Sequence, residues 1–230
     1  MMAKVLFLSS FFCLLGMLGQ AQNNTYELEV RLLWKDAPIQ LDKNYYSNAL
    51  GDSLQFSSLR FYLSQLQLIQ SNRLSEAVLD AKLIDLSDSS SLHLSWTNEE
   101  AFDSIRFLFG LTDEIQKQGV AGGDLDPQKG MYWTWKSGYI LCKIEGSSLS
   151  LSTRKNQFVF HLGGYESPYA VSKELNFTWV KDARKQLLEI DLHRFFESID
   201  LKSNPTLMSA GEKAFRMSEA WTAVFQLKEA

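Results

Sequence analysis

The sequence predicts an all-β domain, an antiparallel β-sandwich closed by a C-terminal helix. Two patterns lead to this fold class. Apolar and polar residues alternate through most of the chain, whereas helical spacing appears only near its end. In the first expected strand, residues 26–34, apolar residues alternate with Glu27, Glu29 and Arg31, as a strand with one buried and one solvated face requires.

Short strands with this alternation follow along the rest of the chain. Within residues 54–69 the phase of the alternation slips between residues 61–63 and 66–68, which predicts a bulge or a bend. The expected strands are residues 26–34, 54–69, 77–86, 102–111, 130–144, 157–162, 175–180 and 186–192.

Two segments change to a helical period. Residues 193–199 can form one or two turns, and residues 211–225 place Ala214, Trp221 and other apolar side chains on one stripe. Ser209 and Glu212 have the spacing of a capping box, in which each side chain bonds a backbone amide of the first turn.

The first residues predict an export signal. Residues 1–21 combine a short basic start, an apolar run that is too short to span a bilayer, and small residues at its end. The mature chain is expected to begin at Gln22, to form one domain over residues 22–230, and to be periplasmic or extracellular. No second apolar run is long enough for a transmembrane segment. Because Cys13 leaves with the signal, Cys142 remains alone and no internal disulfide is expected.

Composition and motifs exclude several classes of function. The formal net charge is −4 and no basic block occurs, which argues against binding of nucleic acid. The chain has no nucleophile elbow, metalloprotease motif or glycine-rich phosphate loop, so we do not expect an enzyme.

Three stretches resemble the MbnP-like family of exported proteins. They read "LQFSSLRFYLSQLQLI" at 54–69, "GDLDPQKGMYWTWKSGYILCKIEGSS" at 123–148 and "FVFHLGG" at 158–164. The resemblance implies a β-rich domain that binds one copper ion at a histidine-based site. In several members a tryptophan is oxidised to kynurenine by a partner di-haem enzyme related to cytochrome c peroxidases. Matched residue by residue, the histidine is His161 and the oxidation candidates are Trp133 and Trp135.

The residue types suit this chemistry. Imidazole binds copper in either oxidation state, and a thioether such as that of Met131 prefers the reduced ion. Indole is a one-electron donor, so Trp133 and Trp135 are suited to pass a hole from an external haem to a buried site. The same alternation of Met131, Trp133, Trp135 and Tyr139 also fills the core of a thick sandwich, because aromatic side chains bury the most area.

The sequence leaves the ligand set open. A copper site needs two or three nitrogen or sulfur ligands. The resemblance implies that relatives often carry further histidines near the first strand and near the C-terminal helix, but residues 32–41 and 204–213 contain none. His161 would therefore need partners from among His93, His193, Met131, Met208 and Cys142.

A second hypothesis needs no metal. The chain would then be an envelope binding module that holds a protein or glycan partner. The tyrosine-rich stretches at residues 44–46 and 164–169 suit this role, since exposed aromatic residues anchor interfaces.

Overall fold

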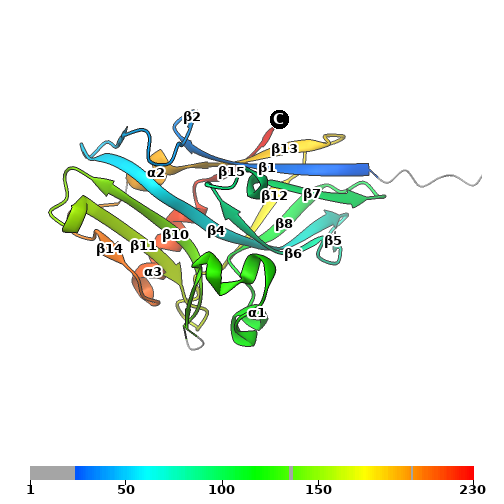
Figure 1. Cartoon of the computed structure of the whole chain (residues 1–230). Helices are drawn as coiled ribbons and strands as arrows, with labels where there is room; N and C mark the ends of the chain where they lie inside the picture. The colour runs from blue at the N-terminus through cyan, green and yellow to red at the C-terminus, as the bar shows by residue number, and fades with distance from the viewer. Residues whose placement is uncertain (1–23, 135–136, 198) are drawn as a thin grey trace, which may run out of the picture.

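A computed structural model describes residues 24–134, 137–197 and 199–230 of the 230-residue chain. Within these residues the strands form a sheet of five strands and a sheet of ten (Figure 1). The fold is mainly β and sandwich-like, as the sequence predicts. The expected signal at residues 1–21, the start at Gln22 and Trp135 all lie outside the described residues.

The five-stranded sheet lies along the top of the view in Figure 1. Its order is β15-β13-β1-β2, and β7 pairs with β1 as well. The pair of β1 and β13 is parallel, whereas the other pairs in this sheet are antiparallel. The strands are β1 (Asn24–Trp34), β2 (Ala37–Pro38), β7 (His93–Asn98), β13 (Lys185–Asp191) and β15 (Phe225–Glu229).

The ten-stranded sheet curls around the long strand β4. Its main order is β12-β8-β4-β10-β11-β14; β3, β5 and β6 pair with β4, and β9 pairs with β10. The last pair, between β11 and β14, is parallel. The strands are β3 (Tyr46–Ser47), β4 (Ser53–Gln70), β5 (Arg73–Leu74), β6 (Leu79–Asp85), β8 (Ser104–Phe109), β9 (Tyr132–Thr134), β10 (Gly138–Ser148), β11 (Gln157–Gly163), β12 (Lys173–Thr178) and β14 (Thr206–Leu207).

Helices are short and occupy the connections. The α-helices are α1 (Asp113–Gln118), α2 (Leu192–Glu197) and α3 (Glu212–Thr222). The 3-10 turns are η1 (Ser89–Leu92), η2 (Gly123–Leu125), η3 (Pro127–Lys129) and η4 (Arg154–Asn156). None of the helices in the described residues has both the length and the apolar character needed to cross a membrane.

Aromatic side chains fill the space that the two sheets and the helices enclose. Trp34 of the five-stranded sheet lies 5.9 Å, centroid to centroid, from Phe56 of the ten-stranded sheet. Trp221 of α3 is fully buried and packs edge-on against Phe61 and Phe195, as the expected packing of the last helix requires. Burial of such rings supplies most of the favourable free energy of folding in a domain of this kind.

The predicted bulge in residues 54–69 is present. The register of β4 against β8 shifts between Ser64 and Gln67, and Gln65 adopts a positive φ of 52°. Before the bulge, Tyr62 and Leu63 are both buried on opposite faces, because Tyr62 packs against Tyr139 and donates its hydroxyl to the carbonyl oxygen of Asp124. The phase slip in the sequence therefore marks a physical irregularity of the strand.

The expectation of one strand over residues 130–144 is wrong. The segment forms two antiparallel strands, because β9 pairs back onto β10 through Thr134 and Gly138. Met131 and Tyr139 are fully buried, whereas Trp133 is only half-buried. These residues therefore do not form one continuous strand face.

The end of the chain also differs from expectation. The last helix stops at Thr222, and Phe225 begins the edge strand β15. Gly211 is the N-cap residue and no side chain caps the helix, so the predicted capping box of Ser209 and Glu212 is wrong. Gly211 adopts a φ of 126°, a backbone conformation that residues other than glycine rarely adopt. The conformation of Gly211 therefore allows the chain to enter α3 without a side-chain cap.

Candidate functional site

A row of polar side chains crosses the outer face of the ten-stranded sheet. The strand registers place four residues opposite one another on β6, β4, β10 and β11: Asp85, Arg60, Lys143 and His161. Their sequence neighbours Ile144 and Phe160 turn inward and are fully buried. The alternation that predicts the strands also places this row outside the core.

His161 is held by a carboxylate on the neighbouring strand. Its Nε2 atom lies 2.6 Å from Oε1 of Glu145, and the residue is only 7% exposed. Because a carboxylate accepts the bond, Nε2 carries the proton, and in a neutral ring with this tautomer the lone pair is on Nδ1. Nδ1 is buried and has no partner among the described residues. In this tautomer the nitrogen available for a metal ion is Nδ1.

Glu145 is ionised at neutral pH. The hydrogen bond from His161 lowers the pKa of its carboxyl group, burial opposes this effect, and the charge of Lys143 lowers the pKa further. A carboxylate held in this way fixes the orientation of the imidazole ring, as second-shell carboxylates do in metal sites.

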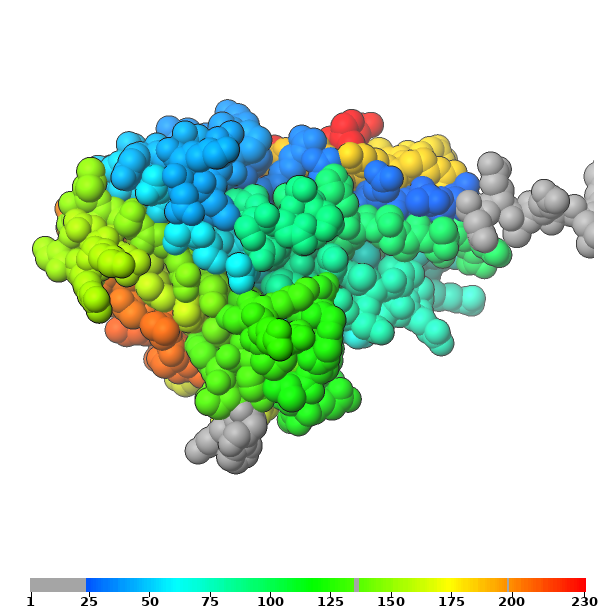
Figure 2. Space-filling view, viewed as in Figure 1, coloured from blue at the N-terminus to red at the C-terminus, as the bar shows by residue number. Residues whose placement is uncertain are grey.

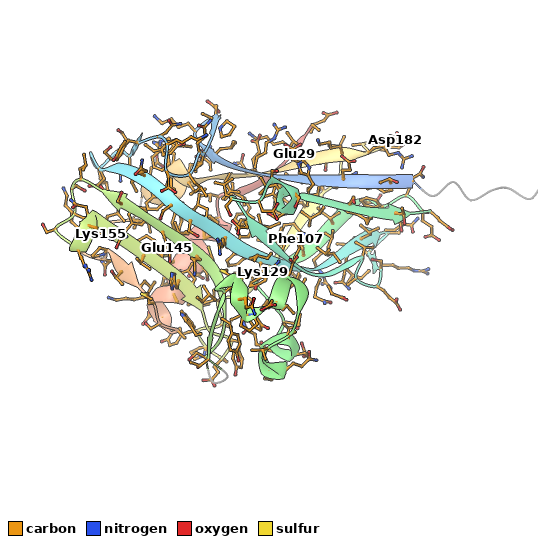
Figure 3. All side chains as sticks on the ribbon, in the orientation of Figure 1. Glu29, Phe107, Lys129, Glu145, Lys155 and Asp182 are labelled. Carbon is orange, nitrogen blue, oxygen red and sulfur yellow. The ribbon has the colours of Figure 1, made fainter. Side chains whose placement is uncertain are left out.

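The segment before β9 covers the cationic part of the row. Arg60 donates from Nη1 to the carbonyl oxygen of Lys129 at 2.9 Å, and Lys143 donates from Nζ to that of Gly130 at 2.6 Å. Burial lowers the pKa of the Lys143 ammonium group. Figure 3 labels Glu145 on β10 and Lys129 in this covering segment. Both cations are thus held by backbone carbonyl groups near His161.

Trp133 lies on the same face of β11 as His161. A Cβ atom built on Gly163 would lie 2.6 Å from Cζ3 and 3.1 Å from Cη2 of the Trp133 ring. Gly163 follows His161 by two residues in β11, so both positions face outward. The structure therefore brings the tryptophan of one motif beside the strand face that carries the histidine of the other. Trp135 lies outside the described residues.

Met131 and Cys142 belong to the core. Both are fully buried, and Cys142 pairs with Phe61 across β10 and β4. Cys142 is a free thiol in the described part of the chain, and burial raises its pKa well above the ordinary value. Both candidates are therefore separated from the outward-facing His161 ring.

The other histidines lie elsewhere. His93 is exposed on β7 of the five-stranded sheet, opposite Glu29 of β1. His193 lies in the first turn of α2; its ring packs edge-on against Trp34, and its Nδ1 lies 3.5 Å from a carboxylate oxygen of Glu197. No three His, Cys, Asp or Glu side chains within residues 24–134, 137–197 and 199–230 gather as a metal-binding group.

Sequence reasoning missed Glu145. Its signal is the pair of charged residues Lys143 and Glu145, which interrupts an apolar stretch with strand spacing. That spacing shows that both side chains leave the core, but it does not show which neighbouring strand they meet. Only the register of β10 against β11 brings Glu145 to His161.

Comparison with known proteins gives a consistent result. A family model described as MbnP matches residues 23–209. Among solved structures the chain is similar to MbnP from Methylosinus trichosporium, with 13% sequence identity, a TM-score of 0.67, and coverage of 91% of this chain and 99% of that one. No curated protein matched. At this identity the structural likeness supports the fold, and the family match extends over most of the sequence: the chain belongs to the MbnP family.

Proposed function

We propose that this protein is an exported copper-binding protein that holds one copper ion at Nδ1 of His161. The observation that carries the proposal is the buried Nδ1 atom, which has no partner among the described residues while Glu145 holds Nε2. An unpaired polar atom in a buried position costs free energy unless something bonds it. A neutral imidazole nitrogen is the commonest protein ligand of metal ions.

The residues around His161 fit such an ion in part. Glu145 supplies the second-shell carboxylate, and imidazole is a strong ligand for copper. Arg60 and Lys143 oppose a cation, but Arg60 forms an ion pair with Asp85 at 2.9 Å and the negative charge of Glu145 acts on Lys143. When bound, copper would supply a redox-active centre. The chain would orient the ring and exclude water from Nδ1.

Trp133 is the tryptophan that we propose for oxidation to kynurenine. It is half-buried and its ring lies over Gly163, one pleat from His161. The indole C2–C3 bond would break, C3 would become the ketone and C2 would leave as formate, with water supplying the oxygen atoms. A di-haem peroxidase partner would take the electrons and pass them to peroxide. Mass spectrometry of the peptide that contains Trp133, from protein made in its own host, tests this modification.

Export belongs to the same proposal. The pattern of residues 1–21 supports removal of a signal and a periplasmic or extracellular location. Determination of the N-terminus of the protein recovered outside the cytoplasm tests it. A chain that keeps residues 1–21 and stays in the cytoplasm would contradict it.

A copper titration tests the central claim. Metal-free protein is titrated with cuprous ion under anaerobic conditions and with cupric ion, each against a chelator of known affinity. We expect one tight site in the wild type and its loss in His161→Ala. His93→Ala is the matched control, because His93 is exposed on the other sheet and should leave binding unchanged.

Thermal unfolding of each variant shows whether it is folded during the titration. If the folded wild type binds copper no more tightly than His161→Ala, the copper proposal fails.

A metal-free binding module is the second candidate. A pocket of about 350 Å³ lies at the end of β11, lined by Tyr165 and Tyr169 together with Glu166 and small residues. Tyr169 is 39% exposed and Tyr45 of the other tyrosine-rich stretch is 55% exposed, whereas Tyr46 is buried. Aromatic and polar groups around a pocket suit a glycan or a peptide side chain. Absence of copper binding together with retention of a glycan by the folded wild type would favour this candidate.

A further inference from the structure

Met208 directly follows β14, the strand that pairs with β11, the strand of His161, at the end of the sheet order. In the parallel pair of β11 and β14, Val159 is opposite Thr206 and Phe160 is opposite Leu207. Met208 is the first residue after β14. If the register is continued by one residue, Met208 corresponds to His161. Paired residues in parallel strands share a face, and neighbouring strands are about 4.8 Å apart.

A second contact fixes the chain on the far side of Met208. A Cβ atom on Gly164 would lie only 2.8 Å from Cβ of Ala210. The segment from Leu207 to Ala210 therefore stays close to the segment from Phe160 to Gly164. In Figure 2 the orange segment that includes β14 lies at the surface beside the yellow-green segment that includes β11.

Met208 has no role in the core. It is 52% exposed, whereas the preceding Leu207 is only 9% exposed and turns inward. Glu145 approaches His161 from β10 on one side of β11, and Met208 follows β14 on the other side. Glu145 and Met208 therefore approach β11 from the strands on its two sides.

We infer that the sulfur of Met208 is the second protein ligand of the metal at His161, and that the pair selects cuprous over cupric ion. This inference rests on the proposed function. It differs from the alternatives that the sequence left open, because Met131 and Cys142 are fully buried in the core and His93 and His193 lie elsewhere.

Ligand chemistry favours cuprous ion here. Thioether sulfur is a soft ligand that binds cuprous ion, whereas cupric ion prefers more nitrogen and oxygen ligands.

The test compares Met208→Leu with Met217→Leu. Leucine keeps the size of the side chain and removes the sulfur, and Met217 is a half-buried methionine on α3 that serves as the matched control. Cuprous affinity is measured by competition with a chelator, and X-ray absorption shows whether sulfur is bound to copper. We expect Met208→Leu to lose at least about tenfold in cuprous affinity, since changes even in outer-shell partners cost 10–100-fold.

A third variant separates the ligand from its surroundings. Met208→His replaces the soft sulfur with nitrogen and should shift the preference toward cupric ion. Unchanged cuprous affinity in Met208→Leu, or no sulfur signal in a copper-loaded wild type, overturns the role of Met208 while leaving copper at His161 intact. If His161→Ala loses copper binding but Met208→Leu binds copper as tightly as the wild type, Met208 is not a ligand. Failure of the wild type to bind copper is the separate result that overturns the proposed function itself.

Discussion

The indole ring of Trp133 occupies the space where a side chain on Gly163 would lie. Its Cζ3 and Cη2 atoms come within 2.6 and 3.1 Å of that Cβ position, and the carbonyl oxygen of Tyr139 within 2.8 Å. A residue larger than glycine at position 163 would collide with the Trp133 ring. The position of this ring beside the face of β11 that carries His161 therefore depends on Gly163.

Gly163→Ala should displace Trp133. The added methyl group cannot fit without movement of the ring, and overpacking of this kind costs about 1–3 kcal/mol. We expect a lower free energy of unfolding in urea and a changed near-UV circular dichroism signal. The same measurement on Gly122→Ala is the control, because its Cβ would meet nothing within 4 Å. Equal stability of the Gly163→Ala variant and the wild type would show that the ring does not lie there.

Glu145→Gln should reduce stability at neutral pH and change its acid dependence. The pKa of Glu145 is lower in the folded protein than its ordinary value of 4.5, so its ionised form adds stability above that pH. This contribution is lost as the pH falls below 4.5 through the lowered pKa. The difference in free energy of unfolding between wild type and variant should therefore be largest at pH 7 and decrease in acid. Urea unfolding at several pH values across this range measures it.

The exposed Glu219 on α3 provides the control for that experiment. Glu219→Gln removes the same charge without removing the bond to His161. A gap of equal size in both variants, or one that widens in acid, would contradict the part assigned to Glu145.

Cys142 should not react in the folded protein. It is fully buried, and burial raises the pKa of its thiol, so little thiolate forms and reagents cannot reach it. We expect no labelling by a thiol reagent in native buffer and complete labelling in urea, with peptide mapping to assign the label to Cys142. Rapid native labelling at this residue would mean that β10 opens readily.

Trp221→Ala should be the most damaging of these changes. The side chain is fully buried and contacts Phe61, Phe195 and Phe225. Its removal leaves a large cavity, and such substitutions cost about 3–5 kcal/mol. Thermal unfolding should show the loss, whereas Leu149→Ala, at a side chain that is 74% exposed, should have little effect. Similar melting temperatures for the two variants would contradict the packing of α3.

The alternation of apolar and polar residues predicts strands well where it arises only from one buried and one exposed face. In β1 and β4 it reports which face meets the core, and even the slip near Gln65 is readable. It fails between Tyr132 and Tyr139, because the same spacing continues through a turn and does not reveal that β9 folds back. Phe225 likewise fits the helical stripe although it begins a strand.

The candidate site was predictable only in its separate parts. The motif identifies His161, and the strand period turns it outward. Its contacts with Glu145 and its position beside Met208 depend on the registers of β11 with β10 and with β14. Registers between strands follow from packing of the whole sheet, which a pattern within one strand does not encode.

The parallel pair of β1 and β13 has a consequence for how the protein is made. Leu28 faces Gln186 and Leu32 faces Ile190, so the edge of β1 that pairs with β13 finds its partner only after residues 185–191 have left the ribosome, although β2 and β7 are made earlier. Until then β1 offers an unpaired edge and uncovered apolar residues, which invite aggregation of the nascent chain. The five-stranded sheet can therefore be completed only when β13 and β15 have been made, near the end of synthesis.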